Sequence, residues 1–200
     1  MATKIAARDV SELRQRTGAG MMDCKRALEE TGSSVDKAVE LLRKKGIASA
    51  EKRADRVAQE GAIASYMHFN GQVGVLVEIN CETDFVARTD EFKELARNIA
   101  LHVASARPLT VRTDELAAEV VDRERTIYRA QAEASGKPEK IWDKIVDGRL
   151  RKYYQESVLL EQPYVKDDKK TVGDLVKEVS GKLGENVVVR RFVRYELGAE

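Results

Sequence analysis

The chain has 200 residues, of which 42% are hydrophobic and 34% are charged, a composition typical of a folded, helix-rich globular protein. Its 35 basic and 34 acidic side chains give a formal charge of +1, which excludes the simplest class of nucleic-acid binder, one held by bulk positive charge. No apolar run approaches the ~20 residues of a membrane-spanning helix, and the N-terminus lacks the apolar core of a signal peptide. We therefore expect a cytoplasmic protein without a membrane partner.

Residues 1–50 predict a small three-helix bundle. Val10 and Leu13 give the first helix an apolar face, and glycine-containing turns separate it from a second helix over Met22–Glu30. A third helix follows and is expected to end at Gly46. Because helices this short bury little surface on their own, the three are expected to share one core.

Residues 51–60 are charged and alanine-rich and are expected to form a linker, which leaves residues 61–200 as a second domain of the α+β class. Two β-rich runs in 61–80 flank Asn70-Gly71, a dipeptide favoured in type I′ turns, and so predict a β-hairpin. The elements expected after it are a helix over 89–107, a helical pair over 113–160, a helix over 171–183 and a strand over 186–196. The hairpin and the last strand together predict a three-stranded, mainly antiparallel sheet with helices packed on one face.

The second strand of the predicted sheet carries apolar residues that we expect on both of its faces. Val73, Val75 and Val77 are set against Leu76 and Ile79 on the opposite side. Helices are expected to cover only one face, so we predict a homodimer formed through the core sheet. The alternative is that the helical pair over 113–160 folds back over the open face.

Patterns of catalytic and metal-binding residues are weak. His68 and His102 are the only histidines, and both are expected to be surface or structural residues. Cys24 and Cys81 lie too far apart in sequence to suggest a zinc site and are expected to be reduced packing residues. No glycine-rich phosphate-binding motif is present. We therefore expect no enzyme, no metal site and no cofactor.

The segment Thr83–Val86 lies where a strand has ended and the next helix has not begun. Phe85 then has no regular face to bury, and an aromatic residue beside an acid in a connecting loop is typical of a docking contact. The alternative is that Phe85 packs under the following helix while Asp84 caps it. Met21 and Met22 present a similar choice between filling a small core and forming a pliable contact surface.

Two long segments resemble the signature sequences of the elongation factor Ts family, the guanine-nucleotide exchange factors of elongation factor Tu. They are Leu13–Leu28 (LRQRTGAGMMDCKRAL) and Glu78–Arg88 (EINCETDFVAR). The segment Leu160–Asp167 is similar to the family as well, so the resemblance covers nearly the whole chain. The chain is similar to the short form of the family, which has a single copy of the sheet-containing core.

The resemblance implies that residues 1–50 are a ubiquitin-associated-like domain that docks on the G domain of elongation factor Tu. The docking residues would be Leu13, Arg14, Met21 and Met22. The residues implied to displace the partner's Mg²⁺ and open its nucleotide site for GDP release are Thr83, Asp84, Phe85 and Val86. The partner would be bound in its GDP-bound and nucleotide-free states, without covalent chemistry by this chain.

A second hypothesis is a nucleic-acid or ribosome-binding module built on Lys140–Lys152. Basic residues there adjoin Tyr153 and Tyr154, whose rings could stack on bases. The interleaved acids and the helical spacing favour a structural helix, so direct contact with nucleic acid is not expected.

Overall fold

The structure is a computed structural model that describes residues 5–199. The chain forms two compact units, and each is assembled from separate stretches of sequence. Unit 1 comprises the residues up to Gly61, Asn80–Phe92 and Val176–Val188. Unit 2 comprises Ala62–Ile79, Lys93–Leu175 and the residues from Val189 onward.

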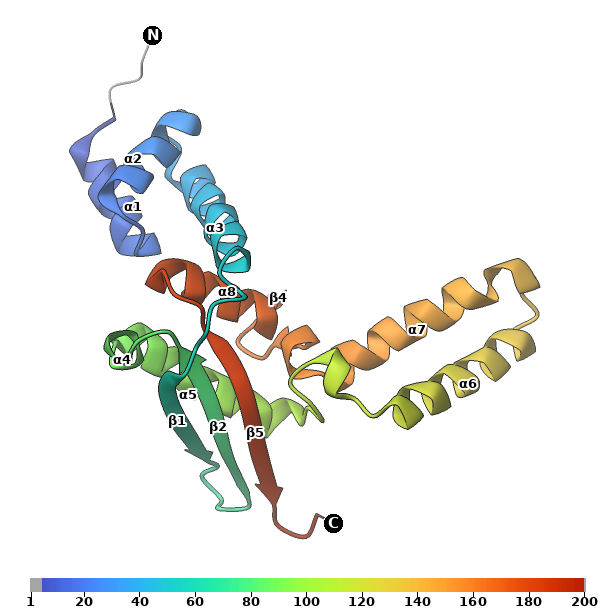
Figure 1. The fold of residues 1–200 in the computed structure, drawn as a ribbon. Coiled ribbons are helices and arrows are strands. Elements are labelled where there is room, and N and C mark those ends of the chain that lie inside the picture. Colours follow the sequence, from blue (N-terminus) through green and yellow to red (C-terminus); the bar gives the residue numbers. More distant parts are fainter. Residues whose placement is uncertain (1–4, 200) are drawn as a thin grey trace. The chain divides into compact units, whose positions relative to one another are not determined.

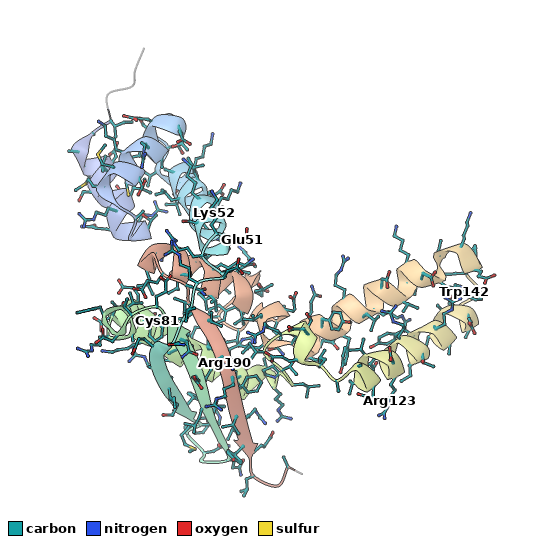
Figure 2. All side chains as sticks on the ribbon, in the orientation of Figure 1. Glu51, Lys52, Cys81, Arg123, Trp142 and Arg190 are labelled. Carbon is teal, nitrogen blue, oxygen red and sulfur yellow. The ribbon has the colours of Figure 1, made fainter. Side chains whose placement is uncertain are left out.

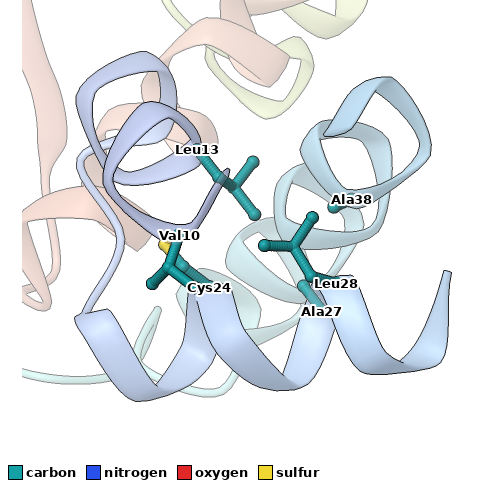
Figure 3. Close-up of a cluster of buried hydrophobic side chains, with 6 residues drawn as sticks. All are labelled: Val10, Leu13, Cys24, Ala27, Leu28 and Ala38. Atoms are coloured by element: carbon teal, nitrogen blue, oxygen red, sulfur yellow. The ribbon is translucent and has the colours of Figure 1, made fainter. Parts of the chain in front are cut away.

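The N-terminal bundle of unit 1 consists of α1 (Ala7–Thr17), α2 (Met21–Glu30) and α3 (Val35–Glu51). Figure 3 shows its core, which is formed by small and medium-sized side chains from all three helices: Val10, Leu13, Cys24, Ala27, Leu28 and Ala38. The predicted three-helix bundle is thus confirmed, but α3 continues through Gly46, where it was expected to end, to Glu51.

A three-stranded antiparallel sheet is formed mostly by residues of unit 2. Its strands occur in the order β1, β2, β5, with the bounds Glu60–Met67, Val73–Cys81 and Val188–Glu196. Helix α5 (Asp90–Ala106) lies across one face of this sheet (Figure 1). The predicted α+β class, with a hairpin joined by a distant last strand, is confirmed.

The hairpin between β1 and β2 has a different turn from the predicted type I′. The carbonyl of His68 accepts a hydrogen bond from Gly71 N (2.8 Å), and His68 N donates to Val73 O (2.9 Å). In this turn only Gly71 has a positive φ (70°), whereas a type I′ turn would also need a positive φ at Asn70. The Asn70 side chain stabilises the loop in another way, since its Oδ1 accepts a hydrogen bond from Gln72 N (3.0 Å). The loop is longer than two residues, so a single glycine suffices to reverse the chain.

The two faces of the sheet differ in burial. Val75, Val77 and Ile79 are all buried on one side of β2, because residues two positions apart in a strand point to the same face. The expectation that Ile79 would share the opposite face with Leu76 was therefore wrong. The opposite face, called here the open sheet face, carries large exposed apolar side chains from all three strands: Ile63, Met67, Leu76, Val193 and Tyr195.

Helices α6 (Ala118–Ala134) and α7 (Trp142–Ser157) pack side by side as the predicted helical pair (Figure 1). Near the turn between them, the Arg129 guanidinium lies 5.2 Å from the ring centroid of Trp142, which Figure 2 labels. The pair does not fold back over the open sheet face, since Met67 is 69% exposed and Tyr195 is 71% exposed.

The remaining elements are short, apart from α8 (Val172–Leu183). A two-stranded sheet that the sequence analysis missed joins β3 (Pro163–Tyr164) to β4 (Asp167–Thr171). Short 3-10 turns are found at Thr113–Glu115, Glu139–Ile141 and Leu159–Glu161, and a one-turn helix, α4, at Asp84–Ala87. Over residues 5–199, no helix combines the length and the apolar character needed to cross a membrane.

Candidate functional site

The segment predicted as an irregular loop forms a capped helical turn, α4, directly after β2. We call Thr83–Ala87 the Thr83 turn. Thr83 has extended backbone angles (φ −129°, ψ 153°), and its Oγ1 accepts a hydrogen bond from Val86 N (3.4 Å). Threonine is a favoured residue at this capping position, since its oxygen satisfies an N–H group that the first helical turn leaves unpaired. Asp84 is not the cap; its Oδ2 accepts from Arg88 Nη2 at 2.7 Å.

Phe85 projects from the Thr83 turn with 78% of its surface exposed. The alternative in which Phe85 packs under its own helix is therefore wrong. Leaving a phenylalanine in water forgoes on the order of 1.5–3 kcal/mol that burial would contribute. A capped turn that holds such a side chain outward is well suited to insertion into a partner protein.

The base of the Thr83 turn combines a buried thiol with half-buried polar residues. Cys81, labelled in Figure 2, ends β2, and its thiol donates a hydrogen bond to Thr83 O (3.1 Å). Burial, reinforced by the nearby Glu185 carboxylate, raises the pKa of the Cys81 thiol to about 11, so the thiol stays protonated. Cys81 is thus the free packing cysteine that was predicted. Glu185 was not predicted, because it lies about 100 residues further along the chain and no local motif marks it.

The predicted docking residues of the bundle fall into two groups. Met21 and Met22 begin α2 with 51% and 62% of their surfaces exposed, and Arg14 is exposed on α1. Leu13, in contrast, is 0% exposed and lies in the bundle core (Figure 3). The assignment of Leu13 to the docking surface is therefore corrected: its side chain supports the bundle and offers no contact surface.

The two histidines have structural surroundings, as expected. His102 is buried, with Nδ1 accepting from Val165 N (3.2 Å) and Nε2 paired with Gln162 Oε1 (2.9 Å). His68 Nδ1 lies 3.0 Å from the Tyr66 hydroxyl. Both nitrogens of His102 are engaged, so it is unsuited to act as a catalytic base. Within the part of the chain that the structure describes, no three histidine, cysteine or acidic side chains gather to hold a metal ion.

The Lys140–Lys152 segment contributes to the packing between α6 and α7. Arg149 lies over the ring of Tyr128, with 5.8 Å between its guanidinium carbon and the ring centroid. Tyr153 and Tyr154 are half-buried. These contacts favour the structural helix over a base-stacking surface, which needs free aromatic faces.

The chain is similar in sequence to known proteins over nearly its whole length. The sequence matches the family model described as Elongation factor TS over residues 4–199. It is 57% identical to Elongation factor Ts of Moorella thermoacetica over 194 residues, which span 97% of this chain and 96% of the relative. It is 56% identical to Elongation factor Ts of Coprothermobacter proteolyticus over 195 residues, with 98% and 99% of the two chains covered. The chain belongs to the elongation factor Ts family.

Proposed function

We propose that this chain is a guanine-nucleotide exchange factor that promotes GDP release from elongation factor Tu. Family membership supports the reaction, and the exposed Phe85 on its capped turn is the observation that carries the mechanism. The proposal places the protein in the cytoplasm with its partner and assigns it no cofactor, no covalent chemistry, no membrane and no direct nucleic-acid partner.

In this mechanism the Thr83 turn enters the partner near its magnesium and nucleotide. A GTPase holds GDP partly through Mg²⁺, which bridges phosphate oxygens and the protein. Phe85 supplies the apolar wedge, Asp84 adds a carboxylate that competes for the partner's cationic groups, and Thr83 and Val86 complete the inserted surface. When the groups that hold the ion shift, both Mg²⁺ and GDP bind less tightly.

The N-terminal bundle supplies the affinity in this proposal. It acts as a ubiquitin-associated-like domain that docks on the G domain through Arg14, Met21 and Met22. Methionines suit such a surface because their unbranched, polarisable side chains adapt to the shape of a partner. The exchange factor binds best to nucleotide-free elongation factor Tu, so it lowers the affinity of elongation factor Tu for nucleotide. Nucleotide must lower the affinity for the exchange factor to the same extent, because the two binding equilibria are linked. GTP in excess can therefore release the factor without the consumption of any further reactant.

We also propose that the chain forms a homodimer through the open sheet face. The exposed apolar side chains of that face come from all three strands and form an unusual surface for a soluble monomer. Arg191 Nε donates to Glu78 Oε2 (2.7 Å) between β5 and β2, which neutralises charge within the face. Two identical faces of this kind can pair about a twofold axis.

The proposed exchange activity is tested by release of labelled GDP from elongation factor Tu. Faster release in the presence of a substoichiometric amount of this chain is expected, because an exchange factor acts repeatedly. Unchanged release would contradict the proposal. RNA binding that persists at physiological salt would instead favour the nucleic-acid alternative, because nonspecific charge contacts weaken steeply with salt.

A further inference from the structure

We infer that Glu185 is a positioning residue of the exchange reaction, which holds the Thr83 turn in the conformation that presents Phe85. The inference rests on the proposed function, and Glu185 acts through the turn, without contacting the partner. It concerns unit 1 alone, which contains both Glu185 and the turn.

The Glu185 carboxylate accepts three hydrogen bonds at the base of the Thr83 turn. Its Oε2 accepts from Glu82 N (3.1 Å) and Thr83 N (3.0 Å), and its Oε1 accepts from the Thr83 hydroxyl (2.6 Å). Hydrogen bonds to an ionised acceptor are shorter and stronger than neutral ones. The carboxylate therefore fixes both the backbone and the side chain of the residue at which the turn begins.

These bonds form a relay that reaches the helical turn itself. The Thr83 hydroxyl commits its proton to Glu185, which leaves its oxygen lone pairs free to accept from Val86 N. Hydrogen bonds in such a chain polarise and strengthen one another. Glu185 thus supports the cap of α4, and through it the direction in which Phe85 leaves the turn.

Glu185 is itself held in place by the residues beside it. Its backbone oxygen accepts from the hydroxyl of Ser180, which is buried on α8. Asn186 N donates to Glu82 Oε1 (2.7 Å), so the segments 82–83 and 185–186 bind each other reciprocally. The side-chain Nδ2 of Asn186 also donates to the backbone oxygens of Ala54 (3.1 Å) and Arg56 (2.8 Å). Because the main chain at 185–186 is held in this way, the Glu185 carboxylate can act as a fixed point for the turn.

Two substitutions separate this positioning role from a general loss of stability. Glu185→Ala removes all three hydrogen bonds and leaves the N–H groups of Glu82 and Thr83 without their acceptor. Glu185→Gln keeps an oxygen for those two N–H groups and places its amide NH₂ opposite the Thr83 oxygen, which can accept. Glu196→Ala is the control: Glu196 is likewise a carboxylate with several hydrogen-bonding partners, here Arg107 and Arg194, but it lies in unit 2.

The experiment measures GDP release from elongation factor Tu with the full-length chain, over a range of factor concentrations. Glu185→Ala should lower the maximal release rate about tenfold while the concentration for half-maximal effect changes little, because docking by the bundle is retained. Glu185→Gln and Glu196→Ala should stay within about threefold of the parent chain.

A double-mutant cycle with Phe85→Ala gives the decisive comparison. If Glu185 acts through the turn, Glu185→Ala should have almost no further effect in a chain that already lacks the Phe85 ring. The inference would be overturned if the two substitutions slowed GDP release independently, so that their fold-changes multiplied in the double variant. It would also be overturned if Glu185→Ala alone released GDP at the parental rate. Thr83→Val serves as a second variant if Glu185→Ala does not fold, and its effect should likewise vanish without Phe85. Failure of the proposed function would be seen separately, as a parent chain that does not accelerate GDP release.

Discussion

His102 illustrates how a buried side chain is fixed in one protonation state by its partners. Its Nδ1 accepts from Val165 N, so in the neutral ring the proton lies on Nε2 and is donated to Gln162 Oε1. Protonation of Nδ1 would remove the hydrogen bond from Val165 N and bring two N–H groups, those of Val165 and of His102 Nδ1, to face each other. Burial lowers the pKa of His102 below its ordinary value of 6.5.

The stability of unit 2 should therefore depend on His102 at mildly acidic pH. Below pH 6.5 the histidine is protonated in the unfolded chain but stays neutral in the folded chain. The stabilisation that neutral His102 gives to the folded state is therefore fully present above pH 6.5 and is lost as the pH falls below it. The loss can reach about 1.4 kcal/mol per pH unit. Thermal unfolding of the parent chain and of His102→Gln between pH 8 and pH 5 measures it; parallel pH profiles of the two proteins would contradict this assignment.

The site residues differ in how far the sequence could predict them. Phe85 was predicted as a contact residue because it lies between regular elements; the structure shows that its ring is exposed, and its role stays a prediction. Leu13 was assigned to docking from its place in a signature sequence, although its spacing from Val10 already gave it to the core. Glu185 could not be identified, because its role depends on a contact with Thr83 that only the folded chain creates.

Among the elements, α3 and α8 in unit 1 approach each other through glycine. A Cβ atom added at Gly181 would lie 2.7 Å from the backbone oxygen of Gly46, closer than real Cβ contacts allow. Two ion pairs flank this crossing, Arg43 with Glu178 and Lys177 with Glu51, the latter at 2.9 Å. The crossing explains why Gly46 does not end α3: the glycine provides close helix packing there, whereas the sequence pattern indicated a stop.

Gly181→Ala should consequently destabilise the chain, by about 1–3 kcal/mol, because the added methyl group forces the two helices apart. Gly148→Ala is the matched control, since Gly148 lies within α7 and a Cβ there meets nothing within 4 Å. That control should gain about 0.5–1 kcal/mol from helix propensity. Denaturant unfolding of both variants decides the point, and equal stabilisation by the two substitutions would contradict the close crossing.

Other elements show where sequence patterns succeed and where they fail. The β-hairpin and the long amphipathic helix α5 have strong periodicity and were predicted within a few residues of their observed bounds. The one-turn helix α4 is too short to have any periodicity, and the β3–β4 pair is a short hairpin of mostly polar residues. Both elements are determined by backbone hydrogen bonds that hydrophobic periodicity does not reveal. For α4 the partners include the distant Glu185 carboxylate, and for β3 and β4 the partner is the neighbouring strand.

For the whole molecule, the open sheet face leads to a prediction about its oligomeric state. Light scattering at micromolar concentration should give about twice the chain mass of 22.4 kDa. Leu76→Arg, on the central strand, should shift the mass toward that of a single chain, because a charge cannot be buried cheaply between two apolar faces. Val165→Arg, at a residue that is 48% exposed between β3 and β4 and whose backbone contacts His102 of α5, should leave the mass unchanged. A parent chain that remains monomeric would contradict the dimer.

We propose that Phe85 opens the nucleotide site of elongation factor Tu, and a matched pair of phenylalanines provides the sharpest test of this role. Phe85 is 78% exposed on the Thr83 turn, and Phe69 is 93% exposed within the hairpin turn, so alanine at either position removes an exposed ring. In labelled GDP release, Phe85→Ala should slow exchange about 5- to 150-fold, the effect of losing one anchor worth 1–3 kcal/mol. Phe69→Ala should release GDP at the parental rate. Equal rates for Phe85→Ala and the parent chain would show that the Phe85 ring does not open the nucleotide site.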